Sequence, residues 1–237
     1  MRHYANLFPP TLTASGLVLV ALAGTAVGGP LEDGEAAYQR EDYATAYRLL
    51  GPLADQGNAE AQDRLGTMYG VGEGVPKNYS EAVKWYRRAA DQGNAEAQSH
   101  LGLMYHNGLG VPQDYVEAMK WCRLAADQGN AEAQDMLGTM YDHGEGVAKN
   151  YSEAVKWYHR AADQGNADAQ SHLGLMYAAG EGVPRDYVRA HKWLNLSAAR
   201  GNNFAIKYRD NIAERMTPVQ IAEAQKLARE WKPKPER

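Results

Sequence analysis

The chain has 237 residues, of which 44 % are hydrophobic, and a formal net charge of −4 at pH 7. This length and apolar content allow one elongated domain with a substantial core, and the weakly acidic charge gives no general attraction to nucleic acid or anionic lipid. The single cysteine, Cys122, excludes an internal disulfide and a thiolate zinc cage, and its position after Trp121 in a predicted helix indicates a small apolar filler.

The first 29 residues differ from the rest. Arg2 precedes an apolar stretch over 17–27, and small residues follow that stretch. We expect a signal peptide over 1–29, because the apolar run is shorter than the roughly 20 residues of a membrane span. The mature protein would be secreted across the inner membrane and would be periplasmic in a two-membrane bacterium. An uncleaved membrane anchor is the alternative.

Residues 30–57 predict a short helical hairpin that caps the fold, with Tyr38 and Tyr43 flanking its turn. A strict repeat follows, because Trp85, Trp121, Trp157 and Trp193 are each 36 residues apart. Four full units result: 58–93, 94–129, 130–165 and 166–201.

Each unit predicts a helix, a loop and a second helix. In the first unit Asn58 is the expected N-cap, and Gly72-Glu73-Gly74 ends the helix. Asn78 should cap the second helix with Glu81 completing a capping-box-like pair, and Asp114 with Glu117 and Asn150 with Glu153 repeat the device. One such hairpin cannot bury its apolar face alone, so neighbouring units must stack.

Residues 202–237 predict capping helices and a disordered tail. Residues 202–216 form a degenerate first helix. A last helix is then predicted by Thr217, Pro218 and Gln220, which form a full capping box at its start. Trp231 should pack the end of this helix onto the core.

The repeated motif AxAQxxLGxMYxxGxGVxxDYxxAxKWxxxAAxQG over 58–201 resembles the Sel-1-like repeat, a relative of the tetratricopeptide repeat. The resemblance implies an all-α fold, an α/α superhelical solenoid of helical hairpins. It also implies an adaptor or scaffold that mediates protein–protein interaction, in envelope assembly or signalling, rather than an enzyme. The expected partner is a protein or peptide, with no nucleic acid, no cofactor and no metal, and membrane contact only if the N-terminal segment is retained.

Most residues that could act in catalysis hold repeated positions, so we interpret them as part of the scaffold. Serines 80, 99, 152 and 171 hold repeat positions, no G-x-S-x-G occurs, and no Lys-Ser/Thr follows the glycine loops. Some members with two cysteines per repeat resemble β-lactamases, but this chain lacks that pattern. A cell-wall or β-lactam hydrolase and a carbohydrate-binding envelope module are the alternatives. The second of these requires the aromatic residues of the second helices to be exposed.

In the tetratricopeptide family the first helices line the concave face, and the resemblance places partner-binding residues there. These are Asp63, Arg64, Thr67, Val71, Ser99, His100, Leu103, His106, Asn107, Asp135, Met136, Thr139, Asp142, His143, Ser171, His172 and Leu175.

The repeat offers a comparison within the chain. The first and third units differ at five positions, and three of these fall on the proposed face: Arg64/Met136, Gly70/Asp142 and Val71/His143. This pattern fits a fixed scaffold with a varied binding surface. Leu103, Met136 and Leu175 are either apolar anchors for a partner or packing between helices.

Overall fold

The computed structural model describes residues 28–234 and separates the chain into two compact units, 1–85 and 86–237. The division falls inside helix α4 (Tyr79–Asp91). Every regular element in the described part of the chain is a helix, which confirms the all-α prediction. The predicted signal peptide over 1–29 lies almost entirely outside the described residues, and no helix within them is long and apolar enough to cross a bilayer.

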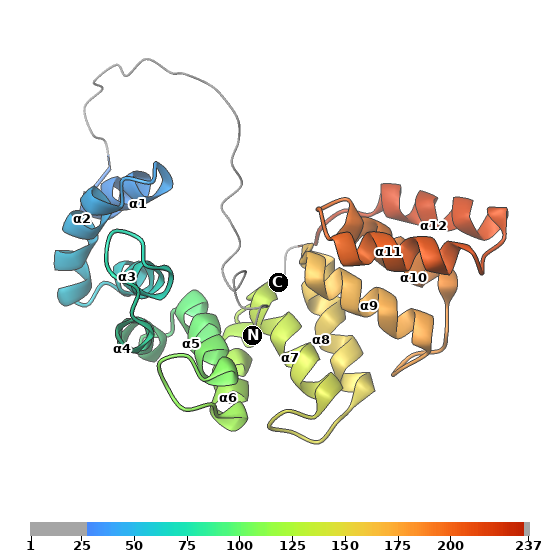
Figure 1. Cartoon of the computed structure of the whole chain (residues 1–237), viewed down its shortest axis with the longest axis horizontal. Coiled ribbons are helices and arrows are strands. Elements are labelled where there is room, and N and C mark those ends of the chain that lie inside the picture. Colours follow the sequence, from blue (N-terminus) through green and yellow to red (C-terminus); the bar gives the residue numbers. More distant parts are fainter. Residues whose placement is uncertain (1–27, 235–237) are drawn as a thin grey trace, which may run out of the picture. The chain divides into compact units, whose positions relative to one another are not determined.

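In the first unit, α1 (Pro30–Gln39) and α2 (Tyr43–Asp55) form the N-terminal hairpin, and α3 (Ala59–Val71) packs against α2 (Figure 1). Tyr38 and Tyr43 flank the turn with ring centroids 5.4 Å apart. Both tyrosine hydroxyls donate to the carboxylate of Glu73, at 2.5 and 3.1 Å. The loop after α3 is thereby held to the capping hairpin.

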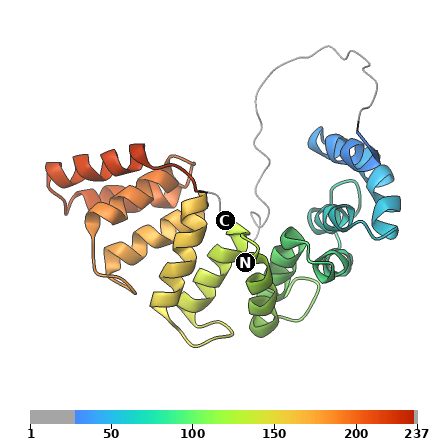
Figure 2. The same ribbon diagram turned by 180° about the vertical axis from the view of Figure 1, so that it is seen from behind.

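The second unit stacks hairpins in sequence order, and Figure 2 shows them from behind. From α5 to α10 each first helix packs on its own second helix, and each second helix packs on the next first helix, whereas α12 packs on α10. The elements after α4 are α5 (Ala95–Asn107), α6 (Tyr115–Asp127), α7 (Ala131–His143), α8 (Tyr151–Gln164), α9 (Ala167–Ala179), α10 (Tyr187–Ala198), α11 (Asn203–Ala213) and α12 (Pro218–Glu230).

Asparagine begins each first helix from α3 to α11. Its side-chain oxygen accepts the backbone N–H three residues on, at 2.8–3.0 Å, which satisfies one free donor of the first turn. The predicted cap at Asn58 is confirmed, and the same device recurs at Asn94, Asn130, Asn166 and Asn202.

The second helices carry only half of the predicted capping box. Asp114 and Asn150 accept the N3 backbone N–H, as expected. The glutamates are directed elsewhere: Glu153 pairs with Lys156 at 2.6 Å, and Glu117 accepts from the indole of Trp121 at 3.2 Å. A complete box is present at Thr217 and Gln220, as predicted.

Glycines allow the helices of a hairpin to approach closely. A Cβ on Gly138 would lie 2.5 Å from the ring of Tyr158, and one on Gly102 would lie 2.4 Å from the Cys122 sulfur. The second glycine of each loop acts between repeats. A Cβ on Gly146 would lie 2.6 Å from the Tyr115 carbonyl oxygen, so the loop rests on the preceding second helix.

The core contains the aromatic residues of the second helices. Trp121, Trp157 and Trp193 are 3–6 % exposed and Trp85 is half-buried, so three of the four repeated tryptophans are core residues and none offers the exposed platform that a carbohydrate-binding module required. Cys122 is fully buried, and burial raises the pKa of its thiol to about 12. Its interpretation as an apolar filler is confirmed.

The C-terminal end closes on the core. Trp231 packs with its ring centroid 6.4 Å from that of Trp193, as predicted. The described part of the tail runs to Lys234, whose backbone N–H donates to the Asp163 carbonyl at 2.8 Å. The described part of the tail therefore lies against the C-terminal end of α8, which corrects the prediction of disorder for residues 232–234.

Candidate functional site

The first helices of the second unit share one face. Helix α5 contacts α7, α7 contacts α9, and α9 contacts α11. Most of the residues predicted to bind a partner lie on these helices, so their surroundings show which of them a partner can reach.

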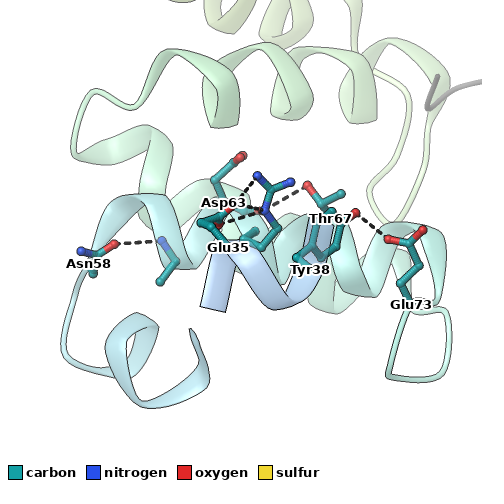
Figure 3. Close-up of polar contacts among 8 residues, drawn as sticks. Glu35, Tyr38, Asn58, Asp63, Thr67 and Glu73 are labelled. Atoms are coloured by element: carbon teal, nitrogen blue, oxygen red, sulfur yellow. Dashed lines mark hydrogen bonds and ion pairs between the residues drawn. The ribbon is translucent and has the colours of Figure 1, made fainter. Parts of the chain in front are cut away.

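On α3, in the first unit, the predicted residues are largely committed to the fold (Figure 3). Arg64 makes a two-pronged ion pair with Glu35 of α1, with a shortest N–O distance of 2.6 Å, and its guanidinium lies 4.4 Å from the ring centroid of Tyr38. Arg64 therefore holds the capping hairpin. Asp63 and Val71 remain half-buried.

Three predicted residues are corrected by their burial. Thr67, Ser99 and Ser171 are 9 %, 6 % and 3 % exposed, so they offer little surface to a partner, although Ser171 lines the hollow described below. Ser99 and Ser171 hold one repeat position and Thr67 holds another, four residues further along the helix. The Thr67 hydroxyl donates to the Asp63 carbonyl at 3.2 Å.

Two of the predicted histidines stack on the preceding second helix. The ring centroids of His100 and Tyr86 are 4.7 Å apart, and those of His172 and Tyr158 are 4.9 Å apart. One edge of each imidazole is thus packed against protein.

Polar contacts fix the ends of the first helices. His106 Nε2 lies 2.8 Å from a carboxylate oxygen of Glu145, in the loop of the next repeat. Asn107 donates to the Leu103 carbonyl at 3.0 Å, and His143 Nδ1 lies 3.0 Å from the Thr139 carbonyl. His143 is exposed, and Asp142 and Thr139 are half-buried.

His172 is also paired across the helices. Its Nδ1 lies 2.9 Å from Asp135 Oδ1 on α7. Burial alone would lower the pKa of His172, but the charge of Asp135 and its hydrogen bond prevail and raise it. A His–Asp pair beside a serine could suggest a hydrolase, yet the Ser171 hydroxyl has no hydrogen-bond partner among the described residues, so the nucleophile-to-base bond is not formed.

The three apolar candidates differ in their surroundings. Met136 packs against the core around Cys122 and Leu137, which supports its interpretation as packing. Leu175 lines a surface hollow. Leu103 is half-buried.

That hollow lies between α7, α9 and α11 and has a volume of about 450 Å³. Five of its lining residues were predicted from the sequence: Asp142, His143, Ser171, His172 and Leu175. The structure adds Asp168, Asn202 and Phe204. Asn202 Nδ2 donates to Asp168 at 3.2 Å across the gap between α9 and α11.

Residues of α11 were missed because the terminal hairpin was treated only as a cap. Tyr208 holds the repeat position of His172, and Phe204 holds that of Asp168. They are 42 % and 48 % exposed, with ring centroids 4.2 Å apart. Extending the register of the first helices into 202–216 would have found Tyr208.

A second hollow, of about 620 Å³, lies among α8, α10 and α12. Its lining includes no predicted partner-binding residue and mixes charges, with Arg189 and Lys192 opposite Asp186 and Glu223. Within residues 28–234 no group of three or more histidine, cysteine and acidic side chains is arranged to hold a metal ion.

Comparison with known proteins identifies the repeat. The Sel1 repeat family matches residues 59–94, 95–130, 131–166 and 167–202, each one residue later than the predicted units. No curated protein matches the chain by sequence.

Solved structures show similar proteins. One is a Sel1 repeat protein from Oxalobacter formigenes, with 34 % identity, a TM-score of 0.73 and coverage of 85 % of this chain and 82 % of that one. Another is c5321, a protective antigen of uropathogenic Escherichia coli with an SLR fold, at 36 % identity and a TM-score of 0.73. This alignment covers 85 % of this chain and 45 % of c5321. The immunity protein Pa5087 of Pseudomonas aeruginosa, at 22 % identity and a TM-score of 0.54 over 84 % of this chain and 79 % of that one, shares the fold.

Proposed function

Since the chain belongs to the Sel1 repeat family, whose fold supports protein-interaction scaffolds, we propose that it is an exported adaptor that binds a segment of a partner protein. The segment would lie on the first-helix face of the second unit. The observation that carries this proposal is the hollow between α7, α9 and α11, which combines the exposed ring of Phe204 and the side chain of Leu175 with polar and acidic groups.

The chemistry of this face suits a peptide. Phe204 and Tyr208 offer exposed rings of the kind that partners bury, and Leu175 adds aliphatic surface beside them. Asp142 and Asp168 lie at the same hollow and can fix the register of a bound chain. The stacked hairpins behind this face keep it rigid, which lowers the ordering cost of binding.

A photo-crosslinking amino acid at position 175, introduced in native cells, tests the binding face. We expect one dominant adduct, which Phe204→Glu should abolish while the protein remains folded. Position 116 on α6 is the matched control, because Val116 is 67 % exposed but lies on a second helix. Equal adducts from both positions, or adducts from position 116 alone, would contradict the proposed face.

Export is proposed on the apolar stretch over 17–27 and the small residues after it. Cell fractionation with N-terminal sequencing of the mature protein tests it. We expect a periplasmic chain that begins near Gly29 or Pro30, with a role in envelope assembly or signalling. A full-length chain in the cytoplasm would contradict export without bearing on the binding face.

A further inference from the structure

We propose that the hollow between α7, α9 and α11 binds a lysine or arginine side chain of the partner segment. This inference rests on the proposed function and adds the chemistry of the recognised residue. The supporting observations are the charge of the lining, its aromatic rim and an unsatisfied buried hydroxyl.

The lining is acidic and contains no lysine or arginine. Asp142 at the end of α7 and Asp168 in the first turn of α9 bring two carboxylates to one hollow. A third carboxylate, Asp135, is already paired with His172 at 2.9 Å. That pairing offsets the imidazole charge, so Asp142 and Asp168, of which Asp168 accepts one hydrogen bond from Asn202, can attract an incoming cation.

These carboxylates lie in a crowded acidic region. Desolvation and the charge of Asp135 raise the pKa of Asp168. On α7, desolvation likewise raises the pKa of Glu132, with further contributions from carboxylates on neighbouring helices. The ionised form of Asp168 is therefore less favoured than that of an exposed aspartate, and a bound cation would offset the repulsion from Asp135.

The rim suits the long apolar stem of a basic side chain. Lysine and arginine bury their methylene groups along apolar surface while the charged end seeks polar partners. Leu175 and the exposed ring of Phe204 supply that surface. Tyr208, stacked on Phe204, extends the aromatic surface, over which a guanidinium or ammonium is attracted by the ring.

Ser171 provides an independent sign of a missing ligand. Only 3 % of the residue is exposed, and it lines the hollow. Its hydroxyl has no hydrogen-bond partner among the described residues. Leaving a buried hydroxyl unpaired is costly, and an N–H donor from a basic side chain would satisfy it.

Peptide selection on the full chain tests the proposal. A random 12-residue peptide library displayed on phage is panned on the immobilised protein, and selected peptides are synthesised with a fluorescent label. We expect a lysine or arginine at one fixed position of the selected sequence. Binding should weaken as salt is raised, because part of the attraction is electrostatic. Acetylation of a selected lysine should remove most of the affinity.

The double variant Asp142→Asn/Asp168→Asn tests whether these two carboxylates bind the basic side chain. We expect its Kd for the selected peptide to rise by about ten-fold or more, as when a charged pair across an interface loses one partner. The control is Asp127→Asn/Glu214→Gln, which removes the same charge from two exposed residues that do not line the hollow. Its Kd should stay within about two-fold of the parent value.

The results of these experiments can contradict the recognition of a basic side chain without contradicting the proposed binding face. Peptides without a conserved basic residue that still lose binding on Phe204→Ala would overturn the inference and keep the binding face. Equal losses in the two double variants would also overturn the inference. Failure to select any peptide that depends on Phe204 or Leu175 would overturn both proposals.

Discussion

Gln164 Nε2 lies 2.9 Å from Gln134 Oε1, and this hydrogen bond joins the end of α8 to the first turn of α7, thirty residues earlier. Gln134 is fully buried and donates its own amide to the Ala126 carbonyl at 3.1 Å. The same donation recurs from Gln62, Gln98 and Gln170 to the preceding second helix. The glutamine of each repeat therefore joins neighbouring helices through buried polar contacts.

The fourth repeat breaks this pattern. Arg200 stands where the other repeats have Gln128 or Gln164, and the Gln170 Oε1 has no hydrogen-bond partner among the described residues. We predict that Gln134→Leu lowers the free energy of unfolding by about 1–3 kcal/mol. Gln170→Leu should cost about 1 kcal/mol less, because one of the two amide bonds is already absent. Urea unfolding followed by circular dichroism checks the difference, and equal losses would contradict the role of the Gln134–Gln164 bond.

Glycine in the first helices is required by close packing. A Cβ at position 138 would lie 2.5 Å from two ring carbons of Tyr158, so the helices must separate to accept it. We predict that Gly138→Ala lowers the free energy of unfolding by about 1–3 kcal/mol.

Gly51 is the matched control. It lies inside α2, and a Cβ there would meet no atom within 4 Å. Gly51→Ala should raise stability by about 0.5–1 kcal/mol, because alanine loses less backbone entropy in a helix. Thermal melts of the two variants give the comparison. Similar shifts of the same sign would show that close approach does not decide the effect at position 138.

We predict that the buried thiol of Cys122 does not react with thiol reagents in the folded protein. Burial raises its pKa to about 12, so the reactive thiolate is scarce at pH 8. We expect no measurable reaction of the folded protein with a thiol-specific disulfide reagent over minutes, and rapid reaction of one thiol per chain in denaturant. Rapid reaction under native conditions would show that the contact between α5 and α6 opens.

The repeat period predicted most of the fold because identical spacing imposes identical helices. Asn58 as an N-cap, the tryptophans as core and Thr217 with Gln220 as a capping box followed from residue type and position. The hydrogen-bond partners of side chains depend on tertiary packing and could not be predicted in this way. Glu117 accepts from the Trp121 indole instead of completing a box, whereas Glu153 at the same repeat position pairs with Lys156 and leaves the Trp157 indole without an acceptor among the described residues.

Tertiary packing also limited what could be predicted about the candidate site. The register identified His172 and Leu175 as facing residues, but it could not tell an available side chain from one already engaged. Arg64 is engaged by Glu35, which lies 29 residues earlier in a hairpin that does not follow the repeat. Phe204 completes the hollow from the degenerate cap, where it holds the repeat position of Asp168 but replaces a carboxylate with an aromatic ring.

We predict that His172 makes a pH-dependent contribution to the free energy of unfolding. It faces Asp135 and Asp142 of α7, Asp168 of its own helix and the ring of Tyr158 on α8. The net effect of these neighbours raises its pKa in the folded protein, chiefly through Asp135 once the opposing effect of burial is overcome. The folded state therefore binds the proton more tightly than the unfolded state does, whose histidine titrates near about 6.5.

The sign of the effect follows from that difference. The stabilisation is fully present below the unfolded pKa and is lost as pH rises through the raised folded pKa. We predict that the stability difference between the parent protein and Asp135→Asn is largest near pH 6 and shrinks toward pH 8.5. Burial lowers the pKa of His159 and His191, which act in the opposite sense, but both are present in the two proteins and cancel. Urea midpoints across this range, with an NMR titration of the His172 ring, measure the effect. A difference that stays constant from pH 6 to 8.5 would show that the Asp135 contact is not linked to protonation of His172.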